Sequence, residues 1–482
     1  MLFNSIEFTL YLPIVFLLYW FLFKTRKRQN LFILFASYVF YGWWDKRFLL
    51  LIAITSFCSY YSGILIEHYE GKRKKQKLVS ACNIILNLLI LGVFKYYNFF
   101  VDNLQVIMRE AFSMNIDWPT LKIILPVGIS FYTFQALSYT IDVYRKNISA
   151  THDLVEFFAY ISFFPQLVAG PIERATNLLP QFQHQRSFNY DKAIDGCRQM
   201  LWGFFKKLVI ADTCAIGVNQ IWNAYQDQSG IMLFVGGLLF TFQIYGDFSG
   251  YSDIAIGCAR LFGFNLKRNF HFPYFSRDIS EFWRRWHISL MTWFRDYIYF
   301  PLGGSRCARW KATRNTIVVF FISGLWHGAN WTFVTWGLYN ACLLVILSFI
   351  GKNKYKVDVA NERWLPSVKE GIQMITTFLF VVIGWIVFRA ENVGQAYHYL
   401  SNMFTHSWID HNISLYIAQI GLALIMLVAE WIQRDKQHAL QISNQGLLQS
   451  TVLRRGLYVI LTLCCMYCFF SNNKSEFIYF QF

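Results

Sequence analysis

Long apolar stretches separated by short charged connectors follow one another along nearly the whole chain of 482 residues. A helix needs about 20 residues to cross the hydrocarbon core of a bilayer, and many of these stretches approach that length. After an opening stretch at 7–23 and a second one a few residues later, they lie at 78–99, 121–143, 153–170, 195–223, 231–263, 312–350, 371–391, 413–432 and 455–471. The pattern predicts an all-helical, polytopic membrane protein, in which 312–350 is long enough for two helices.

The beginning of the chain fits a first span better than a removable leader. No cleavage-site pattern follows 7–23, and another apolar stretch comes soon after it. A secretory signal peptide would end in small residues before a polar mature sequence. We therefore expect 7–23 to remain in the membrane.

Composition and charge support a membrane protein and argue against a nucleic-acid-binding protein. The chain is 55% hydrophobic, 20% aromatic and 15% charged, whereas a soluble protein is about 45–50% apolar and about 25% charged. The net charge of +16 lies in short loops between apolar stretches, which is the pattern of membrane orientation. Ten cysteines are scattered, and the pair Cys465 and Cys468 falls inside an apolar stretch, so we expect buried thiols and no metal site.

The basic residues of the loops predict the orientation. The connector 24–28 is rich in Lys and Arg, 43–48 carries two such residues and 72–77 carries five. Because positively charged loops stay in the cytoplasm, this alternation places the N-terminus outside. The basic loop 434–455 then lies inside and the tail 471–482 outside, which requires an even number of crossings. We expect about 11–13 helical segments, at least one of them a re-entrant or half-membrane helix buried in protein.

The stretch 265–311 differs from the rest, because it mixes arginine with Trp, Tyr and Phe too densely for a lipid-facing span. Amphipathic or re-entrant helices on the cytoplasmic side fit this pattern, and a basic loop that packs on lipid headgroups is the alternative. No repeat or linker divides the chain. We expect one membrane domain over 1–482, with 265–311 as its Arg/Trp-rich region and 471–482 as an external tail.

Two histidines are the main candidates for chemistry. His327 follows apolar residues in 324–333, with Asn330 one turn away, and an imidazole there can act as a general base near neutral pH. Arg284 and Arg285 lie between two tryptophans, and His287 follows the second of them. The two histidines can meet in one buried site while the arginines hold a phosphate-bearing donor. The alternatives are a histidine that only bonds a neighbouring helix, and interfacial anchoring by Trp and Arg.

Three further motifs carry polar or helix-breaking residues. Asp247, Tyr251 and Asp253 lie in an apolar stretch; we expect the carboxylates to orient a histidine or pair with an arginine, because an unpaired buried carboxylate is costly. A Gly-Pro pair at 170–171 ends a helix or shapes a cavity wall. The tail contains Tyr479, whose hydroxyl is a candidate acyl acceptor, although aromatic residues at a chain end more often anchor it at the membrane interface.

These motifs together resemble the membrane-bound O-acyltransferase (MBOAT) family. The resemblance is to the bacterial branch that contains the membrane subunits of alginate and peptidoglycan O-acetyltransferases and the D-alanyl transfer subunit. It runs nearly end to end, through segments 1–8, 164–172, 245–255, 282–287, 324–331, 388–390 and 477–482. The combination is specific, whereas no single segment is.

The resemblance implies helices around a central tunnel, with His327 as the catalytic histidine and His287 as a second active-site histidine. The donor enters from the cytoplasm and the acceptor from outside. In the D-alanyl system the terminal tyrosine lies on a small separate partner and is proposed to take up the acyl group, so Tyr479 corresponds to it here. Asn330, Asp247, Asp253 and Tyr251 are expected to support the site.

The function expected from the resemblance is O-acyl transfer in a bacterial inner membrane. Acetyl-CoA is the expected donor substrate, with no bound cofactor, and the acceptor is a polysaccharide or peptidoglycan hydroxyl outside the cytoplasm. An extracytoplasmic acetyltransferase partner, SGNH-hydrolase-like or similar, is expected. The alternatives are D-alanyl-type transfer, a polysaccharide exporter or secondary transporter, and a non-catalytic scaffold. Transporters often show inverted repeats with paired broken helices, and this sequence shows no such symmetry.

Overall fold

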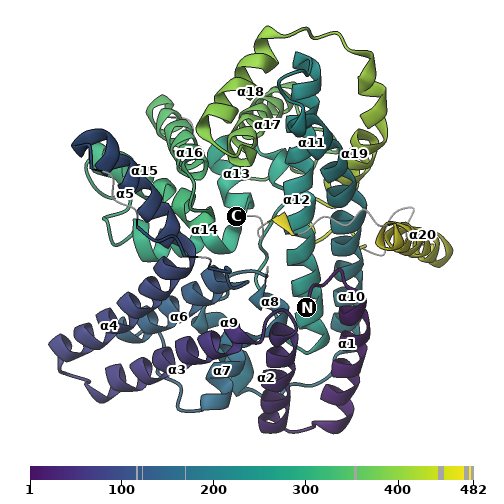
Figure 1. Cartoon of the computed structure of the whole chain (residues 1–482). Helices are drawn as coiled ribbons and strands as arrows, with labels where there is room; N and C mark the ends of the chain where they lie inside the picture. Colours follow the sequence, from purple (N-terminus) through teal and green to yellow (C-terminus); the bar gives the residue numbers. More distant parts are fainter. Residues whose placement is uncertain are drawn as a thin grey trace. The chain divides into compact units, whose positions relative to one another are not determined.

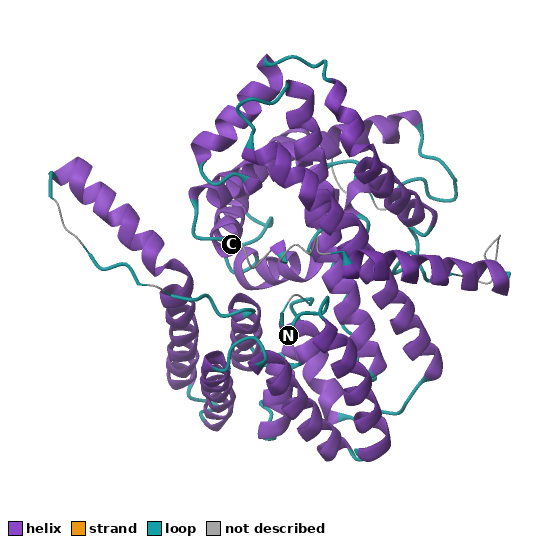
Figure 2. Cartoon of the chain, turned by 45° about the vertical axis from the view of Figure 1, so that its right-hand side comes forward, coloured by secondary structure: helices purple, strands orange, loops and turns teal. Residues whose placement is uncertain are grey.

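The computed structural model describes residues 1–114, 118–121, 123–168, 170–351, 355, 357–442, 450–471 and 477–478. These residues form helices joined by loops and no strand, as Figure 2 shows. Within them, seven helical stretches are long and apolar enough to cross a membrane: Arg47–His68, Arg73–Phe112, Gly230–Leu261, Trp331–Ile350, Val368–Arg389, His411–Ile432 and Thr451–Phe470. The prediction of an all-helical, multi-pass membrane protein is confirmed.

The described chain divides into two compact units. The first comprises Met1–Ala193 with Cys258–Leu266, and the second comprises Ile194–Gly257 with Lys267–Phe482. Both predicted active-site histidines belong to the second unit. The prediction of a single membrane domain, its orientation and its tunnel stay predictions.

In the first unit, polar side chains join the helices that surround α6. The elements are α1 (Ile6–Leu17), η1 (Leu18–Leu22), α2 (Arg26–Gly42), α3 (Arg47–His68), α4 (Arg73–Leu91), η2 (Gly92–Tyr96), α5 (Tyr97–Phe112), α6 (Ile129–Tyr144), α7 (Leu154–Ser162), α8 (Phe164–Leu167) and α9 (Ala175–Gln183). Helices α3 and α4 contact α6 (Figure 1). Asn83 on α4 donates a 2.7 Å hydrogen bond to Thr140 on α6. A Cβ at Gly63 on α3 would lie 2.4 Å from the hydroxyl oxygen of Tyr139, so this contact requires a small residue.

In the second unit, α12 is the central element. The unit contains all or most of α10 (Tyr190–Phe204), η3 (Phe205–Ala211), α11 (Asp212–Asn223), α12 (Gly230–Leu261), η4 (Pro273–Phe275), α13 (Ile279–Arg285), α14 (Ile288–Phe294), η5 (Arg295–Tyr299), α15 (Arg309–His327), α16 (Trp331–Ile350), α17 (Val368–Arg389), α18 (Val393–Thr405), η6 (His411–Tyr416), α19 (Ile417–Ile432) and α20 (Thr451–Phe470). In the most apolar 18-residue stretch of α12, 83% of the residues are buried, whereas the figure for the corresponding stretch of α20 is 11%. A Cβ at Gly250 on α12 would lie 2.7 Å from the carbonyl oxygen of Gly203 on α10, so glycine permits this close packing.

The apolar stretch 312–350 forms two helices, as predicted. Helices α15 and α16 pack tightly against one another. A Cβ at Gly324 on α15 would lie 2.3 Å from the carbonyl oxygen of Phe333 on α16, and a Cβ at Gly337 would lie 2.3 Å from that of Phe320. Glycines on both helices therefore let the two backbones approach, and this packing fixes the turn that carries His327.

The stretch 265–311 contains short helices. Helices α13 and α14 have seven residues each, far fewer than the roughly 20 needed to cross a bilayer. An N-cap begins α13, because the Asp278 side chain accepts a hydrogen bond from the backbone N–H of Glu281. Short helices of this kind fit the predicted amphipathic or re-entrant region, and its cytoplasmic side stays a prediction.

Candidate active site

His327 is the last residue of α15, in the turn to α16. Gly328 follows in an extended conformation, and Asn330 is the N-cap of α16. The Asn330 side chain accepts a 3.0 Å hydrogen bond from the N–H of Thr332 and donates one of 2.7 Å to the carbonyl oxygen of Glu391. Asn330 thus begins one helix and ties the turn to the chain after α17, which holds the position of His327.

The imidazole of His327 is buried among aromatic rings. Its exposed fraction is 4%. The ring centroids of Trp326, Trp336 and Phe388 lie 5.0, 5.0 and 5.3 Å from its own. Since Phe388 comes from α17 and Trp336 from α16, packing of three helices excludes water from this histidine.

His287 lies just before α14 and is also buried, with an exposed fraction of 1%. Its backbone is left-handed, with φ 44°, a conformation that is uncommon outside glycine. Its ring packs edge-on against Phe248 at a centroid distance of 4.6 Å. Burial lowers the pKa of His287 to about 3, so the imidazole is neutral near pH 7.

One indole contacts both histidines. The Trp326 ring centroid lies 6.0 Å from that of His287 and 5.0 Å from that of His327. The structure therefore brings both sequence-predicted histidines to the same aromatic cluster in the second unit. Their catalytic roles stay predictions.

The Asp247 carboxylate binds a buried lysine and the end of the chain. Its Oδ1 lies 2.8 Å from Lys207 Nζ, and its Oδ2 accepts a 2.6 Å hydrogen bond from the backbone N–H of Ile478. Lys207 also lies 2.8 Å from Asp212 Oδ1, and its side chain has no exposed surface. The ring of Tyr251 contacts that of Phe477 at 4.3 Å. The predicted supporting residues Asp247 and Tyr251 thus hold the tail.

The described part of the tail is buried in protein. Phe477 and Ile478 are each 1% exposed. The Phe477 ring lies 6.1 Å from Phe248, which in turn packs against His287. Anchoring at a lipid interface does not explain such burial. Tyr479, the candidate acyl acceptor, follows directly in sequence and lies outside the described residues.

The Asp253 carboxylate belongs to a second buried network. Its Oδ2 lies 2.6 Å from Lys206 Nζ, and its Oδ1 accepts a 2.7 Å hydrogen bond from Gln199. Lys206 also donates to the Ser249 hydroxyl at 2.9 Å and lies 3.9 Å from Glu430. Sequence reasoning predicted an arginine or histidine as partner for the two aspartates and missed both lysines and Glu430. Charged residues inside apolar stretches were the available signal.

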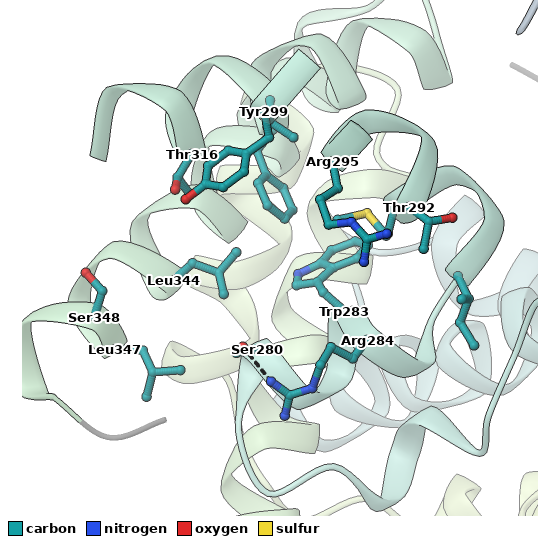
Figure 3. Close-up of a pocket in the computed structure, with 14 residues that line it drawn as sticks. Ser280, Trp283, Arg284, Thr292, Arg295, Tyr299, Thr316, Leu344, Leu347 and Ser348 are labelled. Carbon is teal, nitrogen blue, oxygen red and sulfur yellow. Dashed lines mark hydrogen bonds between the residues drawn. The ribbon is translucent and has the colours of Figure 1, made fainter. Parts of the chain in front are cut away.

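A cavity lies beside the aromatic cluster that contains the two histidines. Its volume of about 630 Å³ is within the range of small-molecule sites. Figure 3 shows the side chains around it; the lining residues are Ser280, Trp283, Arg284, Ile288, Met291, Thr292, Arg295, Tyr299, Thr316, Val319, Phe320, Leu344, Leu347 and Ser348. Trp283, which lines the cavity, lies 5.6 Å from Trp336, a ring that contacts His327. The cavity therefore combines apolar walls with the two exposed guanidinium groups of Arg284 and Arg295.

The two arginines predicted to bind the donor lie in different surroundings. Arg284 lines the cavity and donates to the Ser280 hydroxyl at 3.2 Å. Arg285 is buried, and its Nη2 lies 2.9 Å from Glu281 and 2.6 Å from Asp358. A donor phosphate at Arg285 would have to compete with two carboxylates. Donor binding by either arginine stays a prediction.

The sequence matches a known protein family and several named relatives. The model of the MBOAT, membrane-bound O-acyltransferase family, matches residues 38–383. The chain is 43% identical to "Probable alginate O-acetylase AlgI" of Pseudomonas aeruginosa, over 84% of this chain and 75% of that protein. It is 30% identical to the peptidoglycan O-acetyltransferase of Helicobacter pylori, over 100% and 98% of the two chains. It is 28% identical to the teichoic acid D-alanyltransferase of Bacillus subtilis, over 58% and 72%. The chain belongs to the membrane-bound O-acyltransferase family.

Proposed function

We propose that this O-acyltransferase moves an acetyl group from acetyl-CoA in the cytoplasm to a hydroxyl of a polysaccharide or peptidoglycan outside it, through an ester on Tyr479. One observation carries the proposal. The tail residues Phe477 and Ile478 are buried against the motif of Asp247 and Tyr251, one aromatic ring away from His287. Tyr479 follows Ile478 directly in sequence, so the chain that carries the candidate acceptor is held near His287.

The cavity lined by Trp283 and Arg284, which Trp336 separates from His327, supports a thioester donor. Guanidinium groups bind phosphate oxygens with two parallel hydrogen bonds. Arg284 supplies such a group at the cavity, whereas the guanidinium of Arg295 already donates to both carboxylate oxygens of Asp296. Its apolar wall of Met291, Leu344 and Leu347 suits the less polar arm of a coenzyme A thioester. Acetyl is favoured over D-alanyl because the named acetylases are more similar to this chain and match more of it than the D-alanyltransferase does.

The reaction consists of two transfers. The Tyr479 hydroxyl oxygen attacks the thioester carbonyl carbon, the C–S bond breaks and a C–O ester bond forms. His327 takes the hydroxyl proton as general base and returns it to the sulfur, so that coenzyme A leaves as the thiol. A hydroxyl of the extracytoplasmic partner then attacks the carbonyl carbon of the tyrosyl ester, the bond from that carbon to the tyrosine oxygen breaks, and the hydroxyl proton passes through a histidine to the tyrosine oxygen. His287 supports these steps, and Asn330, Asp247, Asp253 and Tyr251 hold the site together.

The direction of transfer follows from the loop charges. The basic connectors support an orientation with both termini outside and the Arg-rich region 265–311 inside a bacterial cytoplasmic membrane. In this arrangement the donor cavity opens to the cytoplasm. An extracytoplasmic acetyltransferase, SGNH-hydrolase-like or similar, takes the acyl group from the tail and passes it to the polymer.

The proposal is tested with purified protein and acetyl-CoA labelled in the acetyl group. We expect label on the wild-type protein, no label on His327→Ala, and no label on Tyr479→Phe. Tyr467→Phe is the matched control, because it removes a tyrosine hydroxyl from a side chain on α20 that is 78% exposed. Full labelling of Tyr479→Phe would exclude the tyrosine carrier, and full labelling of His327→Ala would exclude the base.

A further inference from the structure

Asn269 is a wholly buried residue, with an exposed fraction of 0%, that binds His287 and the first turn of α14. Its side-chain oxygen Oδ1 lies 3.1 Å from His287 Nδ1, 2.8 Å from the Ser289 hydroxyl oxygen and 3.3 Å from the Ser289 backbone nitrogen. Its amide nitrogen Nδ2 donates a 3.1 Å hydrogen bond to the Ser252 hydroxyl on α12. No motif of the sequence singled out this residue.

These contacts fix which end of the Asn269 amide faces His287. The Ser289 backbone N–H can only donate, so the atom that it meets must be the acceptor Oδ1 rather than the amide nitrogen. His287 Nδ1 meets the same oxygen. Since two lone-pair atoms would repel at 3.1 Å, the Nδ1 atom of the neutral imidazole must carry the proton and donate it to Asn269.

The left-handed backbone of His287 makes this convergence possible. With φ 44° and ψ 51°, His287 precedes α14 in the position of its N-cap. Its ring and the N–H of Ser289, two residues later, consequently reach the same oxygen of Asn269. A left-handed backbone is strained in any residue other than glycine, and it persists where the surrounding contacts stabilise it.

The other ring nitrogen is left as an acceptor. A neutral imidazole has one protonated nitrogen, so Nε2 of His287 holds a lone pair. Nε2 is buried and has no hydrogen-bond partner among the residues that the structure describes. A buried acceptor without a partner is costly in a protein that has no use for it, and a bound hydroxyl would satisfy it.

We propose that Asn269 is a positioning residue that fixes His287 as the Nδ1–H tautomer, so that His287 Nε2 accepts the proton of a substrate hydroxyl. The hydroxyl as ligand rests on the proposed function, whereas the tautomer rests on the contacts of Asn269 alone. A neutral His287 of this tautomer cannot donate to the thioester carbonyl. It is a second proton acceptor beside His327, available to one of the two attacking hydroxyls of the two transfers.

The tautomer is tested by nitrogen NMR on the whole protein, in lipid, with ¹⁵N-labelled histidine. His287→Gln identifies the His287 signals by their disappearance. We expect a protonated Nδ1 and an unprotonated Nε2 in the wild type at neutral pH. An Nε2–H tautomer in the wild type would overturn the proposal whatever the activity, and this measurement does not depend on the folding of any Asn269 variant.

Two variants then test the consequence for transfer. Asn269→Asp keeps an acceptor for Nδ1–H, as the aspartate of a Ser-His-Asp triad does, so we expect transfer within about tenfold of the wild type. Asn269→Leu removes the acceptor, and we expect kcat to fall by about 10²-fold or more with the KM for acetyl-CoA unchanged. Equal losses in both variants would contradict the positioning role. If the NMR result holds but the wild type transfers no acetyl group, the proposed function fails and the tautomer stands.

Discussion

Asp247 on α12 accepts a 2.6 Å hydrogen bond from the backbone N–H of Ile478, a residue 231 positions further along the chain. The bond is buried, and it uses a backbone donor near the end of the chain. Lys207 neutralises the same carboxylate from η3. The C-terminal tail is thus tied to the core of the second unit by a charged group that is itself held in place by an ion pair.

Loss of Lys207 should destabilise this tie. Lys207→Met leaves Asp247 and Asp212 buried without their shared cation, and breaking a buried ion pair in this way typically costs about 3–5 kcal/mol. We expect lower thermal stability in detergent, together with loss of labelling. The exposed residue Lys74 supplies the control Lys74→Met, which should change neither. Recovery is expected when Asp247→Asn is added, because the amide oxygen still accepts from Ile478 and one uncompensated charge is gone. A double variant no more stable than Lys207→Met would contradict the coupling.

A second prediction concerns the turn that holds His327. A Cβ at Gly328 would lie 2.2 Å from the ring of Phe333, so Gly328→Ala must displace that ring or the turn. We expect at least a tenfold loss of kcat, with the KM for acetyl-CoA little changed, because a misplacement of about 1 Å can cost 10²-fold. Gly456→Ala on α20 is the matched control, since a Cβ there would meet no atom within 4 Å among the described residues beyond the adjoining backbone of its own helix. Wild-type kinetics for Gly328→Ala would show that the turn geometry does not matter.

A third prediction separates the two neighbouring arginines. Arg284→Ala removes a cation from the cavity without breaking an ion pair. We expect the KM for acetyl-CoA to rise about tenfold, since hydrogen bonds to charged groups contribute about 1.5–3 kcal/mol, with thermal stability unchanged. Arg285→Ala should instead lower thermal stability, because Glu281 and Asp358 lose a buried partner. The reverse pattern, a stability loss at Arg284 and a pure KM effect at Arg285, would contradict the assignment of the cavity.

The sequence predicted the helices and the two histidines because both leave local signals. Apolar length marks the spans, including the two helices of 312–350, and His327 and His287 stand out as ionisable residues among apolar or aromatic ones. Asn269 left no such signal, since one buried asparagine in a polar-aromatic loop looks like any other. Its importance depends on Ser252, 17 residues earlier on α12, and on the turn before α14.

The partners of the two aspartates could not be predicted for a related reason. Sequence spacing places Asp247 and Asp253 on one helix but says nothing of what packs against it. Lys207 lies 40 positions before Asp247 and Lys206 lies 47 positions before Asp253, both on η3, and only tertiary packing turns them toward α12. The same holds for the tail, whose aromatic residues fit a membrane interface equally well until the burial of Phe477 is known.

The most direct test of the central claim is mass spectrometry of the C-terminal peptide after brief incubation of the purified protein with acetyl-CoA and no acceptor. The peptide that contains Tyr479 should gain the mass of one acetyl group on that tyrosine. The modification should disappear when the acceptor polymer and its extracytoplasmic partner are added, and it should be absent from His327→Ala. An unmodified Tyr479 in a preparation that transfers acetyl groups to polymer at the wild-type rate would contradict the account.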